Sequence, residues 1–268
     1  MIIMKLPFDD MLPCGICSFK KIGELFECRA KSRVPQGAES VIVYLFPYWL
    51  GEEFYENSNI SKYAVPADYH IIAGEYLKSA TEELKKTYPE NQFEYFCDNS
   101  PVNEVKAAVL CGLGVKGRNG LLINEKYGSF CFIGEIVTDA VFDYSVPKAD
   151  GCLDCGLCVE KCPAGALSES RVDKTKCLSD ITQRKGELSE EYVSMIKSEG
   201  CVWGCDVCQD VCPMNSNISV TPVKEFFESA VSCFFAGDSV DGRAYGWRPR
   251  KVIERNLKFL KSDNDDLK

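Results

Sequence analysis

The residues with the clearest chemistry are cysteines, of which the 268-residue chain has 16. Four of them follow the spacing C-x2-C-x2-C-x3-C-P known from iron–sulfur proteins: Cys152, Cys155, Cys158 and Cys162, with Pro163 after the last. A partial copy lies downstream at Cys205, Cys208 and Cys212, again followed by proline. Thiolates at this spacing bind [4Fe–4S] clusters. The two Cys-Pro endings favour two clusters over a structural zinc site or free thiols.

The order of the cysteines also predicts which cluster each one ligates, because the cysteine before the proline belongs to the other cluster in two-cluster proteins. The first cluster would then be held by Cys152, Cys155, Cys158 and Cys212. The second would take one further thiol besides Cys162, Cys205 and Cys208. A strict repeat would require that thiol at Val202. Cys201 lies one residue out of register and Cys177 lies further back, so the spacing leaves the eighth ligand open.

Asp98 is a second candidate for chemistry. It follows the run Phe93–Cys97, which predicts a strand, and it precedes Ser100-Pro101, a pattern typical of a helix start. Ligands of α/β sheets bind where strands end and helices begin. Asp98 could therefore act on a ligand or simply cap the next helix. The chain has one histidine, His70, which disfavours most zinc enzymes and histidine-dependent nucleophiles.

Predicted strands and helices follow one another up to about Pro147, and they must position these residues. Beyond Pro147 the composition changes, and the chain becomes rich in Cys, Gly and Asp. Strands are predicted over 40–46, 93–97, 120–124 and 129–137, and helices over 68–88 and about 101–110. The pattern indicates an α/β or α+β module at 1–146, a small cysteine-rich domain at 147–220 and a helical extension at 221–268. In the extension we predict helices over 222–234 and 249–261. A bare ferredoxin would not need the first module, which implies a second site there.

The composition of the chain indicates where in the cell the protein acts. Apolar residues make up 46% of the chain, and the formal net charge is −9, so no global attraction to nucleic acid is expected. No apolar run approaches the length of a membrane span, and the first residues do not resemble a secretory signal. We therefore expect a cytoplasmic protein that does not contact the membrane and uses its cysteines for metal rather than disulfides.

In combination, these motifs resemble the epoxyqueuosine reductase family over roughly residues 30–260. The first cysteine motif contributes to the match. The other matching segments are 68–70 (DYH), 97–101 (CDNSP), 112–119 (GLGVKGRN), 127–130 (YGSF), 134–139 (GEIVTD), 163–167 (PAGAL), 177–179 (CLS), 182–186 (TQRKG) and 203–213 (WGCDVCQDVCP). A general ferredoxin would share only the cysteines.

The resemblance implies an α+β protein. Its first part would be an α/β module that binds cobalamin and is similar to nitroreductases and reductive dehalogenases. A bacterial 2[4Fe–4S] ferredoxin-like domain and a short helical C-terminus would follow. The implied reaction is the two-electron opening of an epoxide with loss of water, which reduces epoxyqueuosine to queuosine in tRNA. An external donor such as a flavodoxin or ferredoxin would supply the electrons.

The resemblance also implies roles for single residues. Asp98 matches the proton donor of the family, which would need a pKa raised by burial to hold its proton near pH 7. Cys177 would be the eighth cluster ligand, and Lys185 would face tRNA. His70 is expected to begin a helix rather than to ligate cobalt. The positions that match cobalamin contacts, together with Asp98, are Arg33, Ser61, Asn119 and Leu122.

The match stops at the entry to the helical repeats that the family carries at its C-terminus, so we expect a short form. Residues 243–261 hold seven Lys or Arg side chains against Glu254 alone, which predicts a basic patch for a phosphate backbone or, alternatively, a solvated helix face. Two other functions stay open: a cobalamin and iron–sulfur reductase of a small molecule, and a ferredoxin-type electron carrier. The cysteines without a predicted role are Cys14, Cys17, Cys28 and Cys201.

Overall fold

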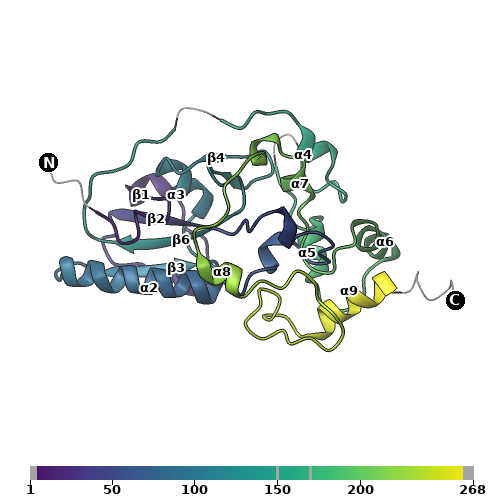
Figure 1. Ribbon diagram of the computed structural model, residues 1–268. Coiled ribbons are helices and arrows are strands. Elements are labelled where there is room, and N and C mark those ends of the chain that lie inside the picture. Colours follow the sequence, from purple (N-terminus) through teal and green to yellow (C-terminus); the bar gives the residue numbers. More distant parts are fainter. Residues whose placement is uncertain (1–4, 149–150, 169–170, 262–268) are drawn as a thin grey trace.

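The main sheet has four antiparallel strands in the order β1-β2-β6-β3. The computed structural model describes residues 5–148, 151–168 and 171–261 (Figure 1). The strands are β1 Cys14–Ser18, β2 Ser40–Pro47, β6 Cys131–Thr138 and β3 Phe93–Cys97. A separate ladder joins the two-residue strands β4 Val115–Lys116 and β5 Leu122–Ile123. β3 is an edge strand, so the residues after it lie at a corner of the sheet.

One helix covers each face of this sheet (Figure 1). Every residue of β2 is buried, and its side chains alternate between the two faces. Ile42, Tyr44 and Phe46 share a core with helix α2 Tyr69–Thr87. Val41, Val43 and Leu45 share a second core with helix α3 Glu104–Leu110. This helix–sheet–helix arrangement with an antiparallel sheet confirms the α+β class.

Helix α2 begins where its sequence predicts. Asp68 is the N-cap, and its carboxylate accepts a hydrogen bond of 3.0 Å from the backbone N–H of His70. The predicted apolar stripe is buried on the sheet: Ala73, Leu77, Ala80 and Leu84. This start places Tyr69 and His70 in the first turn of the helix, beside the end of β3.

The cysteine-rich segment packs against the end of the sheet layers (Figure 1). Its helices are α4 Leu157–Glu160, α5 Leu178–Thr182, α6 Glu190–Glu199 and α7 Val207–Asp210. Trp203 is fully buried, and its carbonyl accepts a 2.8 Å bond from the Ser61 N–H. Gln209 accepts a 2.9 Å bond from the hydroxyl of Ser129. The two parts of the chain therefore share a polar, buried contact.

Helix α9 Lys251–Lys261 closes the described chain and packs on α5 and α6. Asn256 is buried there and donates 2.8 Å bonds to the carbonyls of Thr182 and Val202. The remaining short elements are α1 Phe19–Ile22, α8 Lys224–Glu228 and the 3-10 turns Arg29–Arg33, Glu52–Phe54, Lys62–Ala64 and Pro213–Asn215. None of the helices in the described ranges is both long and apolar enough to cross a bilayer.

Several predicted boundaries differ from the structure. The helix expected over 222–234 is reduced to α8, because the chain beyond it bonds to other segments instead: Val231 N–H to Val65 and Phe234 N–H to the Asn59 side chain. The strand expected over 120–124 is reduced to β5. α3 starts at Glu104 behind Asn103, so neither Ser100 nor Asp98 caps it. β1 and α6 were not predicted.

Candidate functional site

The cysteines predicted for the first cluster surround one small cavity. Cys152, Cys155, Cys158 and Cys212 all line it, although they come from two separate runs. α4 and α7 pack together and bring the two runs to the same place. Gly117, Arg118 and Asn119 from the glycine-rich turn complete the wall. Four thiols around a common cavity are the donor set that a [4Fe–4S] cluster requires.

The remaining predicted thiols gather around Cys208. Burial raises the pKa of Cys208 to about 12, and the neighbouring Cys177, Asp206 and Cys162 add to this shift. Cys205 also has Cys208 among its neighbours. Among the described residues, no three His, Cys, Asp or Glu side chains are placed to share a single metal ion.

Cys201, the rival for the eighth position, is engaged elsewhere. Its thiol lies 3.2 Å from the carbonyl oxygen of Trp203 and 3.6 Å from that of Gly204. Cys177 is the N-cap residue of α5 and lies next to Cys208. Cys201 in turn lies near Cys205, so each of the two thiols has a predicted ligand of the second cluster as a neighbour.

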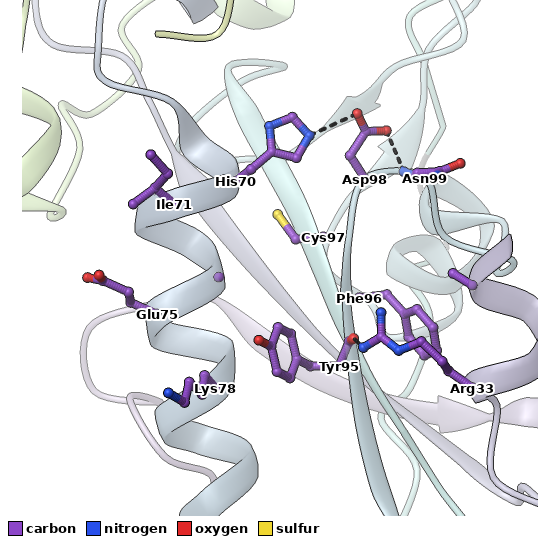
Figure 2. Close-up of a pocket in the computed structure, with 12 residues that line it drawn as sticks. Arg33, His70, Ile71, Glu75, Lys78, Tyr95, Phe96, Cys97, Asp98 and Asn99 are labelled. Atoms are coloured by element: carbon purple, nitrogen blue, oxygen red, sulfur yellow. Dashed lines mark hydrogen bonds and ion pairs between the residues drawn. The ribbon is translucent and has the colours of Figure 1, made fainter. Parts of the chain in front are cut away.

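Asp98 lies at the mouth of a second, larger cavity of about 520 Å³ (Figure 2). One wall is the outer face of α2, the opposite wall is β3, and the 3-10 turn Arg29–Arg33 contributes Ala30 and Arg33. Figure 2 shows His70 and Asp98 facing each other across the end of this cavity. The other lining side chains that the figure labels are Ile71, Glu75, Lys78, Tyr95, Phe96, Cys97 and Asn99.

A hydrogen-bond network fixes the carboxylate of Asp98. Its Oδ2 accepts from the Tyr69 hydroxyl at 3.0 Å and lies 3.2 Å from Nε2 of His70, and its Oδ1 accepts from the Asn99 N–H at 2.7 Å. On the other side of the imidazole, Nδ1 lies 2.6 Å from Asp68. His70 thus bridges two carboxylates. Asp98 and Asn99 both adopt positive φ (55° and 45°), a conformation that Asp and Asn tolerate better than most residues.

This network overturns the expected ionisation of Asp98. Its hydrogen bond with His70 outweighs burial and lowers the pKa of Asp98 to about 2. Hydrogen bonds with Asp68 and then Asp98 raise the pKa of His70 to about 9. The predicted raised pKa of Asp98 is therefore wrong for this arrangement. At pH 7 the proton resides on His70.

No role in chemistry could be predicted for His70, because its partner Asp98 lies 28 residues away on another element. The sequence held one signal: His70 lies in the first turn of a predicted helix, and the next strand along the chain ends directly before Asp98. In an antiparallel sheet, the start of the helix and the end of the strand can meet at the same edge. The expectation that His70 lies in the first turn of a helix is confirmed.

Arg33 reaches the cavity but already has partners. Its Nε donates to Glu94 at 2.8 Å, and its Nη2 donates to the same carboxylate and to the carbonyl of Tyr95 at 2.8 Å. The guanidinium lies 5.0 Å from the ring centre of Phe96. About half of the side chain stays exposed, so Arg33 still presents positive charge to the cavity.

The structure does not bring the other predicted cobalamin contacts to this cavity. Asn119 lines the cysteine cavity instead, and Leu122 is buried in the core beneath α3. Ser61 is buried against Gly204, whose missing side chain leaves the space that the Ser61 hydroxyl fills. The Ser61 hydroxyl and Asn119 Nδ2 are both buried without a hydrogen-bond partner.

The cavity itself offers room for a flat group. Gly74 of α2 lines it, and a side chain at this position would meet no atom within 4 Å, so it would extend into open space. A planar ring could lie against this part of the helix, with the Arg33 cation beside it. Asp98 would then face the ring from the cavity end.

The basic stretch 243–261 is less available than its composition predicts. Arg243 donates to the carbonyls of Val65 and Ser229, and Arg255 donates to those of Arg184 and Gly186. These arginines fasten the C-terminal segment to the body of the protein. Four lysines in this region remain exposed: Lys251, Lys258 and Lys261 on α9, and Lys185 between the two carbonyls that Arg255 contacts.

Comparisons with known proteins give consistent matches. A family profile described as a 4Fe-4S double cluster binding domain matches residues 151–215, and one described as epoxyqueuosine reductase QueG matches residues 29–99. The epoxyqueuosine reductase of Leadbetterella byssophila is 36% identical over 241 residues, which cover 85% of this chain and 79% of that protein. The one from Cyclobacterium marinum is 38% identical over 189 residues, which cover 68% of this chain and 60% of that protein.

One similar solved structure is an epoxyqueuosine reductase with an epoxyqueuosine-modified tRNA stem loop. Its TM-score is 0.75 at 21% identity, and the match covers 93% of this chain and 76% of that one. At this identity the match establishes a common fold.

Proposed function

Because the chain belongs to the epoxyqueuosine reductase family, we propose that it is a cobalamin-dependent iron–sulfur reductase that converts epoxyqueuosine in tRNA to queuosine. The observation that carries this proposal is the pairing, in one chain, of a double-cluster cysteine segment with a cavity that presents the His70–Asp98 pair. An electron carrier alone would need only the first of these.

The two clusters are proposed to be held by four cysteines each. Cys152, Cys155, Cys158 and Cys212 line one cavity and form the first set. The second set is Cys162, Cys177, Cys205 and Cys208. Its choice of Cys177 over Cys201 is supported by the contacts of the Cys201 thiol with two backbone carbonyls. Each cluster passes one electron at a time, so two clusters suit a reduction that needs two electrons.

Cobalamin is proposed to lie in the cavity between α2 and β3. Gly74 leaves room for its ring and Arg33 offers a cation to its amide or phosphate groups. When bound, it would supply low-potential electrons to the epoxide carbon. The contacts implied for Ser61, Asn119 and Leu122 have no support from the positions of these residues.

The protein's own part in the reaction is to bring a proton to the oxygen that leaves the epoxide. Opening the epoxide and losing water consumes two electrons and two protons. The His70–Asp98 pair holds one of these protons at Nε2 of His70, 3.2 Å from Oδ2 of Asp98. Asp98 is the outer member of the pair and would pass the proton on. Asp68 holds the imidazole in place from behind.

We assign the tRNA contact to the surface around α9. Lys185, Lys251 and Lys258 are exposed there, next to the turn that Arg255 fastens. Lysines of this kind bind the phosphate backbone without reading its sequence. The electron donor is proposed to be a flavodoxin or ferredoxin that docks near the clusters.

The direct test is an anaerobic assay of the reconstituted protein on tRNA that carries epoxyqueuosine, with a chemical or flavodoxin reductant. We expect conversion to queuosine only when iron, sulfide and cobalamin have all been supplied. Conversion without cobalamin, or none with all components and full iron content, would refute the proposal. Retained iron without any retained cobalt would favour the electron carrier instead.

A further inference from the structure

A buried carboxyl group lies directly behind the Asp98 loop. Glu135 is in the middle of β6, paired with Val43 of β2 on one side and Phe96 of β3 on the other. It is fully buried, and neither of its carboxylate oxygens has a hydrogen-bond partner. Phe96 is only two residues before Asp98. Since buried polar groups normally have partners, this one needs an explanation.

A second carboxyl group shares this environment. Glu104 is the first residue of α3, the helix that covers the face of the sheet to which Val43 and Phe96 contribute their side chains. Its Oε1 is also buried and without a partner. Glu104 and Glu135 are close enough for each to influence the ionisation of the other, and Asp98 acts on both.

The charged and titratable surroundings hold little to stabilise two negative charges. Asp98, Lys174 and His70 face Glu104. Asp98 and Cys17 face Glu135, and the nearby Ser100 hydroxyl favours its charged form. Cys97 faces both carboxyl groups. Only Lys174 and His70 are cationic, and His70 is already bonded to two other carboxylates. An unpaired carboxylate in such a place is disfavoured, so burial raises the pKa of both groups.

We propose that Glu104 and Glu135 form an internal proton store that reloads the His70–Asp98 pair. The inference rests on the proposed reductase function. That reaction needs two protons, whereas the pair holds one. Once a tRNA loop covers the cavity, water cannot easily supply the second.

The proton passes from the group with the lower pKa, Glu104, to the group with the higher pKa, His70. The Glu104 O–H bond breaks and its proton passes, through Asp98, to the imidazole of His70. Burial, then the charge of Asp98, raise the pKa of Glu104 to about 7, while that of His70 is about 9. The pKa of Glu135 is raised well above its usual range, also chiefly by burial, so Glu135 keeps its proton when Glu104 has lost its own. Solvent restores the store after product leaves.

The test has one readout that does not depend on activity. Infrared difference spectra in H₂O and D₂O detect protonated carboxyl groups, and we expect Glu104 and Glu135 each to contribute to the carboxyl band at pH 6, so that Glu135→Gln loses one of the two contributions. The exposed Glu82→Gln serves as the matched control and should keep the band. Iron content and the melting temperature check that each variant is folded. An unchanged carboxyl band in Glu135→Gln would overturn the proposed proton store, whether or not the protein is a reductase.

The second readout is the pH profile of single turnovers on epoxyqueuosine tRNA. Wild type should slow about tenfold from pH 6 to pH 8, because the protonated fraction of a group with a pKa near 7 falls by that factor. Glu104→Gln should be slow and insensitive to pH over this range, and Glu82→Gln should follow wild type. A wild-type profile in Glu104→Gln would overturn the inference. No turnover by wild type with full cofactors would instead refute the proposed function, and with it the reloading step.

Discussion

At the scale of single residues, the ionisation of Asp98 depends on its hydrogen bond with His70, which lowers the pKa of Asp98 to about 2. Its place after a strand and before a helix could be predicted from neighbours in the chain. Its ionisation could not, because His70, Tyr69 and Asp68 reach it from another element. Asp98 was expected to be buried among apolar side chains, but in the structure it is hydrogen-bonded to His70. The cysteines behave differently, since their spacing alone predicts seven of the eight ligands and leaves only the choice between Cys177 and Cys201 open.

Replacing Asp98 tests its role as the outer proton carrier. Asp98→Asn keeps the shape of the side chain but removes its capacity to take up and release a proton. We expect reductase activity to fall by about 10²-fold or more, with iron content unchanged. The exposed Asp143→Asn is the matched control and should retain full activity. Equal activity of the two variants would eliminate Asp98 as the proton carrier.

The His70–Asp98 pair should also leave a signature in stability. The raised pKa of His70 stabilises the fold fully below its unfolded value of 6.5, and this contribution is lost as the pH rises through about 9. The lowered pKa of Asp98 stabilises the fold at pH values above 3.8, and this contribution is lost as the pH falls through about 2. The melting temperature of His70→Gln should therefore differ most from wild type between pH 4 and 6.5.

The size of this effect should be small, because 56% of the Asp98 side chain and 42% of the His70 side chain are exposed. Solvent screening then limits the contribution to at most about 1 kcal/mol. Thermal unfolding in buffers from pH 4 to 10 measures it. A difference that grows above pH 9 would contradict the assigned protonation states.

At the scale of elements, local patterns predicted the long α2 and the central strands, and failed where tertiary bonds decide. The stretch 222–234 has helical composition, yet it leaves the helix after Glu228. Ser229 accepts a bond from Ala67 N–H, and Val231 N–H bonds to Val65. These partners lie more than 150 positions earlier in the chain, so no local pattern could reveal them.

The attachment of α9 depends on Asn256, which is fully buried and donates to two backbone carbonyls of the cysteine-rich segment. Asn256→Ala leaves both carbonyls unsatisfied. We expect a loss of about 2 kcal/mol in the free energy of unfolding, measured with urea. The exposed Lys258→Ala on the same helix should change stability by less than about 0.5 kcal/mol. Equal effects would mean that the two bonds contribute nothing.

At the scale of the whole molecule, the acidic chain carries a basic C-terminal stretch, and the structure divides that stretch into two kinds of residue. Arg243 and Arg255 fasten the segment through backbone carbonyls. Lysines on α9 remain exposed. The sequence predicted the charge of the stretch correctly but could not separate these two uses, because the carbonyls that accept the arginines belong to distant segments.

This division predicts how tRNA binding responds to salt. Lys258→Ala should weaken binding and reduce the slope of log Kd against log salt by about 1, since one phosphate contact is lost. Lys85→Ala, near the far end of α2, should change neither value (Figure 1). Titrations by fluorescence anisotropy at several salt concentrations measure both. An unchanged slope in Lys258→Ala would remove α9 from the tRNA surface.

Metal quantification is the most direct test of whether one chain holds two clusters and one cobalamin. After anaerobic reconstitution and desalting, we predict about eight iron and one cobalt per chain. Gly74→Leu should fill the cavity and lose cobalt while keeping its iron, whereas Ser79→Leu, which does not line the cavity, should keep both. Eight iron with no retained cobalt in the wild-type protein would contradict the account.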